Sequence, residues 1–143
     1  MDRRIVRASS CLCLGLLVLL ASVAGASQNG VSLSGSYHVV QKQITGSRVK
    51  VTLHVQLTNL GSDALTIRQL SLKDGLTQIQ KQVLMNLGPR AMQGSTQSFN
   101  ISRREYENWR RGVGPVVQIT TQTENGSSVS QAIRLDGFGG GVK

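Results

Sequence analysis

The segment from Val49 to Asn59 alternates apolar and polar residues, and this pattern restricts the fold more than any other part of the chain. Apolar side chains occupy positions 49, 51, 53, 55 and 57, with polar side chains between them. Successive side chains of a β-strand point to opposite faces, so a period of two predicts a strand with one buried and one solvated face. The chain is therefore expected to contain a sheet that packs on one side only.

Further short strands are expected on both sides of this segment, bounded by turn residues. The strand at 64–72 changes its apolar phase near Arg68, which indicates a bulge or a break. Asn125-Gly126 suits a turn, so the last two strands form a hairpin with a loop of about four to six residues. The expected strands cover residues 33–43, 64–72, 76–87 (one strand or two), 96–101, 117–121 and 129–135.

One helix is expected over residues 103–111. The segment from Ser102 to Glu105 matches a capping box. In this motif the Ser102 hydroxyl accepts a hydrogen bond from the Glu105 amide, and the Glu105 carboxylate accepts one from the Ser102 amide. Gly112 can adopt the left-handed conformation that ends a helix. At about two turns, the helix needs to pack on the rest of the domain to be stable. Tyr106 and Trp109 are three residues apart and so share one face, which we expect to be the packing face.

About seven strands, with one short helix before the final hairpin, predict an all-β fold: a single immunoglobulin-like antiparallel β-sandwich. Two stretches resemble the B–C region and the approach to strand E in bacterial immunoglobulin-like modules of the fibronectin type III and CARDB-like kind. They are Val49-x-Val51-x-Leu53-x-Val55-x-Leu57-x-Asn59-x-Gly61 with Leu65-x-Ile67, and Leu87-Gly88-Pro89 with Thr96-x-Ser98-x-Asn100. The resemblance covers most of residues 31–136 and implies a secreted β-sandwich module. It does not extend to an antibody-type core, since no cysteine pair spans the sheets and Trp109 falls on the helix.

The first 26 residues match a secretory signal peptide, with arginines at positions 3, 4 and 7, a leucine-rich core at 12–20 and small residues at 24–26. We expect cleavage after Ala26. The alternative is a retained membrane anchor, but the apolar core is short against the ~20 residues that span a bilayer. Residues 27–136 would then form the sandwich domain and residues 137–143 a flexible glycine-rich tail. The expected location is secreted or periplasmic, with no transmembrane span after cleavage.

The expected helix is rich in arginine, in a chain with a formal net charge of +9. Arginines in the first turn oppose the positive end of the helix dipole, so helix stability does not account for them. We expect a binding site for an anionic envelope polymer or a protein. The alternative is a set of solvated charges, partly neutralised by Glu105 and Glu107. The candidate binding residues are Arg103, Arg104, Tyr106, Trp109, Arg110 and Arg111.

No catalytic residues, cofactor or metal site are expected. The acidic residues suit structural positions, with Asp63 and Asp74 in turns and Glu105 in the capping box, and no nucleophile-elbow or zinc-protease motif is present. His38 and His54 lie on the solvated faces of their strands and could approach each other if these strands were neighbours. Two histidines still fall short of the three or four ligands of an ordinary zinc site.

The sequence therefore predicts an exported, non-catalytic binding or structural module without a nucleic-acid partner. One alternative is an envelope assembly protein that pairs through an edge strand, and a second is an enzyme. A binding module should show a contiguous arginine-rich or aromatic surface, and an assembly protein a long, flat, uncharged edge strand. An enzyme should show a concave pocket with convergent polar groups. Asn100 and Asn125 also match the N-glycosylation acceptor pattern.

Overall fold

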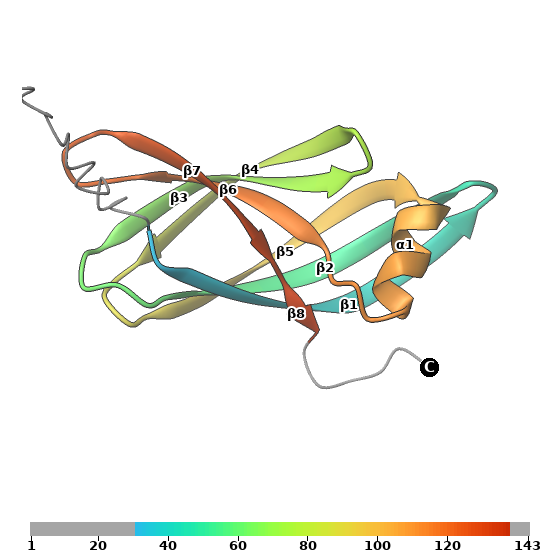
Figure 1. The fold of residues 1–143 in the computed structure, drawn as a ribbon, viewed down its shortest axis with the longest axis horizontal. Helices are drawn as coiled ribbons and strands as arrows, with labels where there is room; N and C mark the ends of the chain where they lie inside the picture. Colours follow the sequence, from blue (N-terminus) through green and yellow to red (C-terminus); the bar gives the residue numbers. More distant parts are fainter. Residues whose placement is uncertain (1–30, 138–143) are drawn as a thin grey trace, which may run out of the picture.

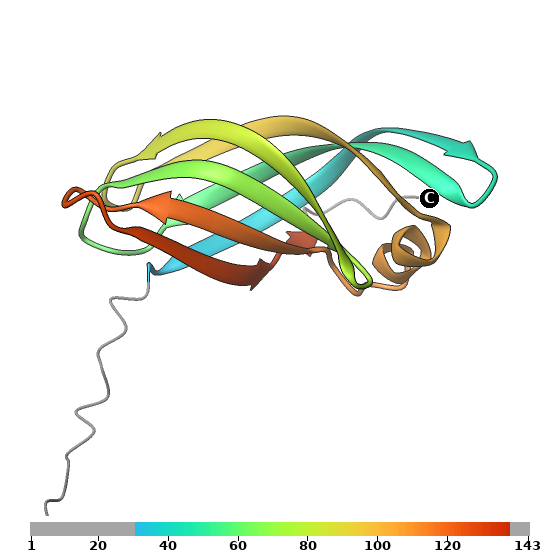
Figure 2. The same ribbon diagram turned by 90° about the horizontal axis from the view of Figure 1, so that it is seen from above.

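A computed structural model describes residues 31–137, which form two facing β-sheets with one short helix at an end (Figures 1 and 2). The expected signal peptide (1–26) and residues 138–143 of the expected tail lie outside this range. The elements are β1 (Leu33–Thr45), β2 (Arg48–Asn59), β3 (Leu65–Asp74), β4 (Thr77–Leu87), β5 (Met92–Ser102), α1 (Arg103–Arg110), β6 (Val116–Gln122), β7 (Ser128–Arg134) and β8 (Asp136–Gly137).

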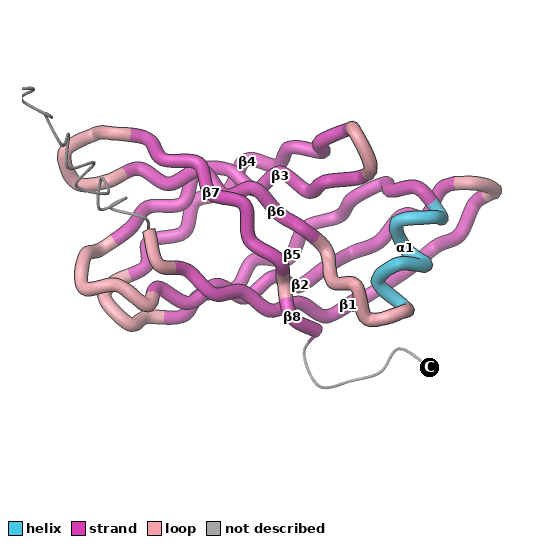
Figure 3. Tube along the Cα trace, in the orientation of Figure 1, coloured by secondary structure: helices cyan, strands magenta, loops and turns pink. Residues whose placement is uncertain are grey.

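The strands are ordered β5-β2-β1-β8 in one sheet and β4-β3-β6-β7 in the other. The chain crosses between sheets from β2 to β3, from β4 to β5, through α1 from β5 to β6, and from β7 to β8 (Figure 3). This confirms the predicted all-β sandwich with one short helix before the final hairpin. The strand β8 was not expected, and it includes Gly137, which was expected to begin the flexible tail. It pairs with β1 in parallel, and with only two residues it carries no periodic signal.

The alternating segment that predicted the fold is β2, at the centre of its sheet. Each of its apolar positions from Val49 to Leu57 is at most 1% exposed. They pack in one core with residues of the opposite sheet such as Ile67 and Ile119, which have no exposed surface. Complete burial of a Val, Leu or Ile side chain stabilises the folded state by roughly 1.5–3 kcal/mol, so this face contributes strongly to the stability of the domain.

Several local expectations are confirmed and others change in extent. The pairing of β3 shifts register between Ile67 and Gln69, so the expected irregularity at Arg68 is a bulge. The segment 77–87 is one strand rather than two. The strand expected from residue 96 begins at Met92. Residues 92–95 were not predicted because they lack apolar alternation, and they join the sheet through pairing with β2.

Asn59, the last residue of β2, ties together the loops at the end of the sandwich opposite the helix. Its side chain has no exposed surface. The side-chain amide donates to the carbonyls of Asp63 (2.7 Å), Gly88 (3.1 Å) and Leu87 (3.3 Å), and its oxygen accepts from the amide of Gly61 (2.9 Å). One side chain therefore satisfies backbone groups of the β2–β3 and β4–β5 connections.

Candidate functional site

The helix α1 follows β5 without a break and is fixed at both ends. Ser102 is its N-cap, and the serine hydroxyl accepts from the Glu105 amide at 3.2 Å. The amide of Arg103 donates to the carbonyl of Ser47 in the β1–β2 turn at 2.9 Å. At the other end Gly112 has a φ of 90°, so the predicted left-handed helix stop is confirmed. The helix is therefore held against the tip of the β1–β2 hairpin.

The second half of the predicted capping box is wrong. The Glu105 carboxylate accepts from the indole N–H of Trp109 at 2.9 Å and does not reach back to Ser102. The Ser102 amide donates instead to Asp74 Oδ2 at 2.8 Å, and the Ser102 hydroxyl donates to Asp74 Oδ1 at 2.6 Å. The cause is tertiary, since the end of β3 in the opposite sheet brings a carboxylate to the helix start. Asp74 therefore precedes the Gly75 turn, as expected, and its buried carboxylate also accepts hydrogen bonds from the opposite sheet.

The aromatic residues of the helix form its packing face, as expected. Tyr106 is 2% exposed and Trp109 5% exposed. The rings of Tyr37 and Trp109 meet edge-on with centroids 6.0 Å apart, and those of Tyr106 and Trp109 with centroids 6.3 Å apart. The Lys42 ammonium lies 5.7 Å from the centroid of the Tyr106 ring. Both helix aromatics are therefore core residues and leave the set of candidate binding residues, because packing covers their rings. The four arginines of that set are exposed.

The Tyr106 hydroxyl is buried without a hydrogen-bond partner among the described residues. Burial raises the pKa of the neighbouring Tyr37 phenol, and Tyr106 raises this pKa further. An unpaired buried hydroxyl costs about 1–3 kcal/mol of desolvation. We therefore expect Tyr106→Phe to leave the free energy of unfolding unchanged or to raise it by about 1 kcal/mol, measured by urea denaturation. A loss of more than about 1 kcal/mol would contradict this, because it would mean that the hydroxyl is bonded in solution.

The four helix arginines are all exposed and stand at the same end of the sandwich as other cationic residues. Lys50 lies near the β1–β2 turn, and Lys73 precedes the β3–β4 turn. Arg48 donates to the Asn100 carbonyl and lies 3.5 Å from Asp74. We call this end the basic end, defined by these residues: Lys42, Arg48, Lys50, Lys73, Arg103, Arg104, Arg110 and Arg111.

The acidic groups of the basic end are occupied by internal contacts. Asp74 and Glu105 accept the hydrogen bonds described above, and the Glu107 carboxylate lies 3.3 Å from the Arg110 guanidinium. Within residues 31–137, Arg103, Arg104 and Arg111 form no ion pair. These three guanidinium groups therefore present charge to the solvent.

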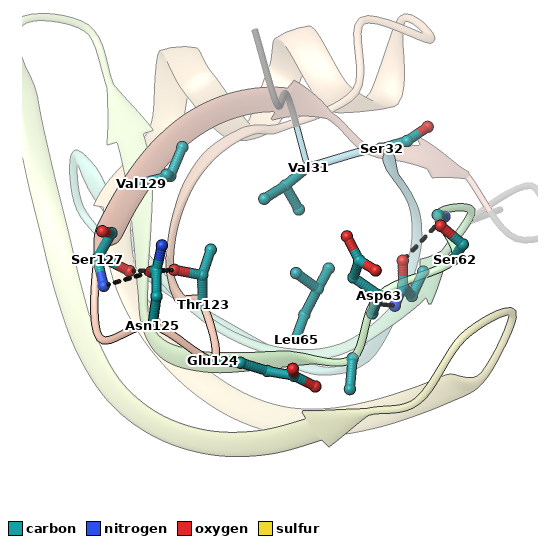
Figure 4. Close-up of a pocket in the computed structure, with 13 residues that line it drawn as sticks. Val31, Ser32, Ser62, Asp63, Leu65, Thr123, Glu124, Asn125, Ser127 and Val129 are labelled. Atoms are coloured by element: carbon teal, nitrogen blue, oxygen red, sulfur yellow. Dashed lines mark hydrogen bonds between the residues drawn. The ribbon is translucent and has the colours of Figure 1, made fainter.

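A pocket of about 730 Å³ lies at the opposite end of the sandwich, between the β2–β3 and β6–β7 loops (Figure 4). Two acidic residues line it, Asp63 and Glu124. Asn125 Oδ1 accepts from Thr123 Oγ1 and from the Ser127 amide, so it holds the loop shape. In the part of the chain that the structure describes, no group of three or more His, Cys, Asp or Glu side chains gathers here or elsewhere.

The two histidines lie close together, because β1 and β2 are neighbouring strands. His38 and His54 are direct partners across β1 and β2, with ring centroids 5.0 Å apart. His54 Nδ1 lies 3.0 Å from Thr96 Oγ1, and its Nε2 lies over Gly94, where a Cβ atom would come within 2.5 Å. Both ring nitrogens of His54 therefore lie toward β5, on the side away from His38, and the pair does not form a chelate in this arrangement.

Comparisons with known proteins give no family for this chain. No protein-family model matches it, and no curated protein matches it either. A solved structure of a Northeast Structural Genomics Consortium target, SoR45, is 14% identical, with a TM-score of 0.42, and covers 76% of this chain and 87% of its own. A protein from Archaeoglobus fulgidus is 8% identical, with a TM-score of 0.33, and covers 73% of this chain and 94% of its own. These likenesses are too distant to inform the function. Separately, residues 31–137 include no helix long and apolar enough to cross a membrane.

Proposed function

We propose that this chain is an exported, non-catalytic binding module whose basic end binds an acidic polysaccharide of the cell envelope or the extracellular space. The finer class that we propose is a secreted immunoglobulin-like module of the bacterial fibronectin type III or CARDB-like kind. The observation that carries the proposal is the exposure of Arg103, Arg104 and Arg111 beside acidic groups that are already engaged.

The distribution of charge supports binding at one end of the domain. The basic end gathers most of the cationic residues in the range 31–137, whereas Asp63 and Glu124 lie at the pocket end. Such an asymmetric field attracts a polyanion and orients the domain toward it before contact. Guanidinium groups suit this role because they present several fixed donors to carboxylate or sulfate oxygens.

The position of the arginines on the helix supports the same role. Arg110 and Arg111 lie near the negative end of the helix dipole, where positive charge is favourable. Arg103 and Arg104 lie at the positive end, where positive charge is unfavourable by about 0.3–1 kcal/mol. Their presence is better explained by a ligand than by helix stability, because the core contacts of α1 are made by Tyr106 and Trp109.

The test is retention on a heparin column, with heparin as the acidic polysaccharide. We expect the variant with Arg103, Arg104 and Arg111 changed to Gln to elute at a clearly lower salt concentration than the natural protein. The variant lacks three exposed charges that would contact the polysaccharide, and charges act only over about 10 Å at 0.1 M salt, so distant charges do not replace them. The matched control changes Arg68, Arg90 and Arg134 to Gln, which removes equal charge from exposed positions outside the basic end. Equal elution of the two variants would contradict the proposal, since net charge alone would then set retention.

A further inference from the structure

The strand β5 forms an open margin of its sheet and carries no charged residue. It is the terminal strand in the order β5-β2-β1-β8 and runs for 11 residues. Its pairing with β2 is unbroken from Ser102 to Met92. Figure 2 shows β5 with β4 along one rim of the sandwich. Edge strands of natural proteins are usually short, bulged, charged or interrupted by proline, and β5 has none of these protections.

The backbone groups that β5 offers at this margin follow from its hydrogen bonds. The amide of Arg103 donates to Ser47 on the side of β2, whereas the preceding amide, of Ser102, points away from β2 to Asp74. Successive backbone groups of a strand alternate in direction, and the register contains no bulge. The even-numbered residues therefore turn their N–H and C=O groups to the open edge. They are Met92, Gly94, Thr96, Ser98 and Asn100.

Cationic residues stand at both ends of this uncharged edge and beside it. Arg90 precedes β5, and Arg103 and Arg104 follow it directly. On the facing edge strand β4, the Lys81 ammonium lies 5.9 Å from the centroid of the Phe99 ring. Neither β4 nor β5 contains an acidic residue. At the helix end of the rim the Asn100 carbonyl accepts from Arg48, and the Ser102 amide donates to Asp74. The unpaired backbone groups of the rim therefore run from Met92 to Ser98, with cationic residues at each end.

We propose that β5 binds an extended segment of a partner protein as an additional strand, and that this segment is uncharged at its centre and acidic at both ends. Main-chain hydrogen bonds to the even-numbered residues would supply the pairing, and Arg90 at one end and Arg104 at the other would select the acidic flanks. This inference goes beyond the proposed polysaccharide binding. It shares Arg103 and Arg104 with it but rests on the backbone of β5.

A second copy of the chain fits this edge poorly. In the antiparallel register that pairs the whole strand with itself, Met92 of one copy lies opposite Ser102 of the other. The cationic residues next to the strand, Arg90 of one copy and Arg103 and Arg104 of the other, then come together at each end of the contact. Like charges brought close together repel, so the same arginines that favour an acidic segment oppose self-pairing.

Hydrogen exchange of the natural protein tests the proposal without a substitution. The probe is a synthetic peptide with an alternating Thr-Val centre and a pair of glutamates at each end, and its matched control carries lysines at the ends. With the probe, the amides of Thr96 and Ser98 should exchange at least about tenfold more slowly, while those of Gln97 and Phe99, already bonded to β2, should not change. The lysine-ended peptide should bind about tenfold more weakly. Absence of slowing with the probe, or equal binding of both peptides, would overturn the proposal.

A pair of variants separates edge pairing from the proposed polysaccharide binding. Ser98→Pro removes an edge-facing amide, which an edge strand tolerates, and Ser98→Ala removes only the hydroxyl that contacts Thr52. We expect Ser98→Pro to lose peptide binding at least about tenfold, while Ser98→Ala retains it and both keep the retention of the natural protein on heparin. Peptide binding unaffected by Ser98→Pro would contradict the inference. A concentration-dependent dimer in sedimentation, with the same edge amides protected, would also contradict it by identifying a second copy as the occupant.

Discussion

Replacing Asn59 with alanine should lower the free energy of unfolding by about 2–4 kcal/mol, the largest loss that we expect from any single polar substitution in this domain. The substitution removes an amide that satisfies three backbone carbonyls and an oxygen that accepts from the Gly61 amide. Each buried polar group left without a partner costs about 1–3 kcal/mol, but partly exposed groups can turn to water, which limits the total.

The measurement is urea denaturation of both proteins, followed by circular dichroism. Asn86→Ala is the matched control, because Asn86 is exposed on β4 and its side-chain oxygen accepts a hydrogen bond from Thr66 Oγ1. Its effect should fall within about 0.5 kcal/mol. An Asn59→Ala loss as small as that of the control would mean that water replaces these contacts at no cost. The hydrogen bonds of the Asn59 side chain to the loops would then contribute nothing to stability.

Asp74→Ala should lower the free energy of unfolding by about 2–3 kcal/mol. Its side chain is 5% exposed and accepts from the amide and the hydroxyl of Ser102, so its removal leaves a donor unpaired at the helix start. The contact with Arg48 adds less, because the Arg48 side chain is 49% exposed. The larger part of the loss is therefore expected from the two bonds to Ser102.

A double-mutant cycle with Ser102→Ala isolates this contact. The sum of the losses in unfolding free energy of the two single variants should exceed the loss of the double variant by about 1 kcal/mol or more, as for residues that share hydrogen bonds. Asp136→Ala, on the exposed strand β8, serves as a control for the loss of one negative charge. Additive losses in the cycle would refute the link between the β3 end and the helix start.

The patterns that the sequence predicted correctly are those with local causes. The alternation in β2, the bulge at Arg68 and the left-handed Gly112 all follow from neighbouring residues and are present in the structure. The aromatic face of the helix was also expected from spacing alone. Each of these signals rests on a side-chain period or a backbone preference that a short segment carries by itself.

The features that escaped prediction depend on contacts between distant segments. The capping-box rule predicts that the Glu105 carboxylate accepts from the Ser102 amide, but in the structure this amide donates to Asp74 of the other sheet. In the sequence, Asn59 indicates only the end of a strand. The folded chain brings the carbonyls of Leu87 and Gly88 within hydrogen-bond distance of its side chain. For the candidate site, the arginines were identified from sequence. The engagement of nearby acidic groups, which leaves Arg103 and Arg104 open to solvent, was visible only in three dimensions.

The most direct test of the proposed role is an NMR titration of the natural protein with a short heparin oligosaccharide. Amide shifts should change along α1 and at the β1–β2 turn beside it, and the changes should weaken as salt is raised. The loops that carry Asp63 and Glu124, at the pocket end, should not respond. Shifts that centre on the pocket loops, or that spread evenly over the surface, would contradict the account.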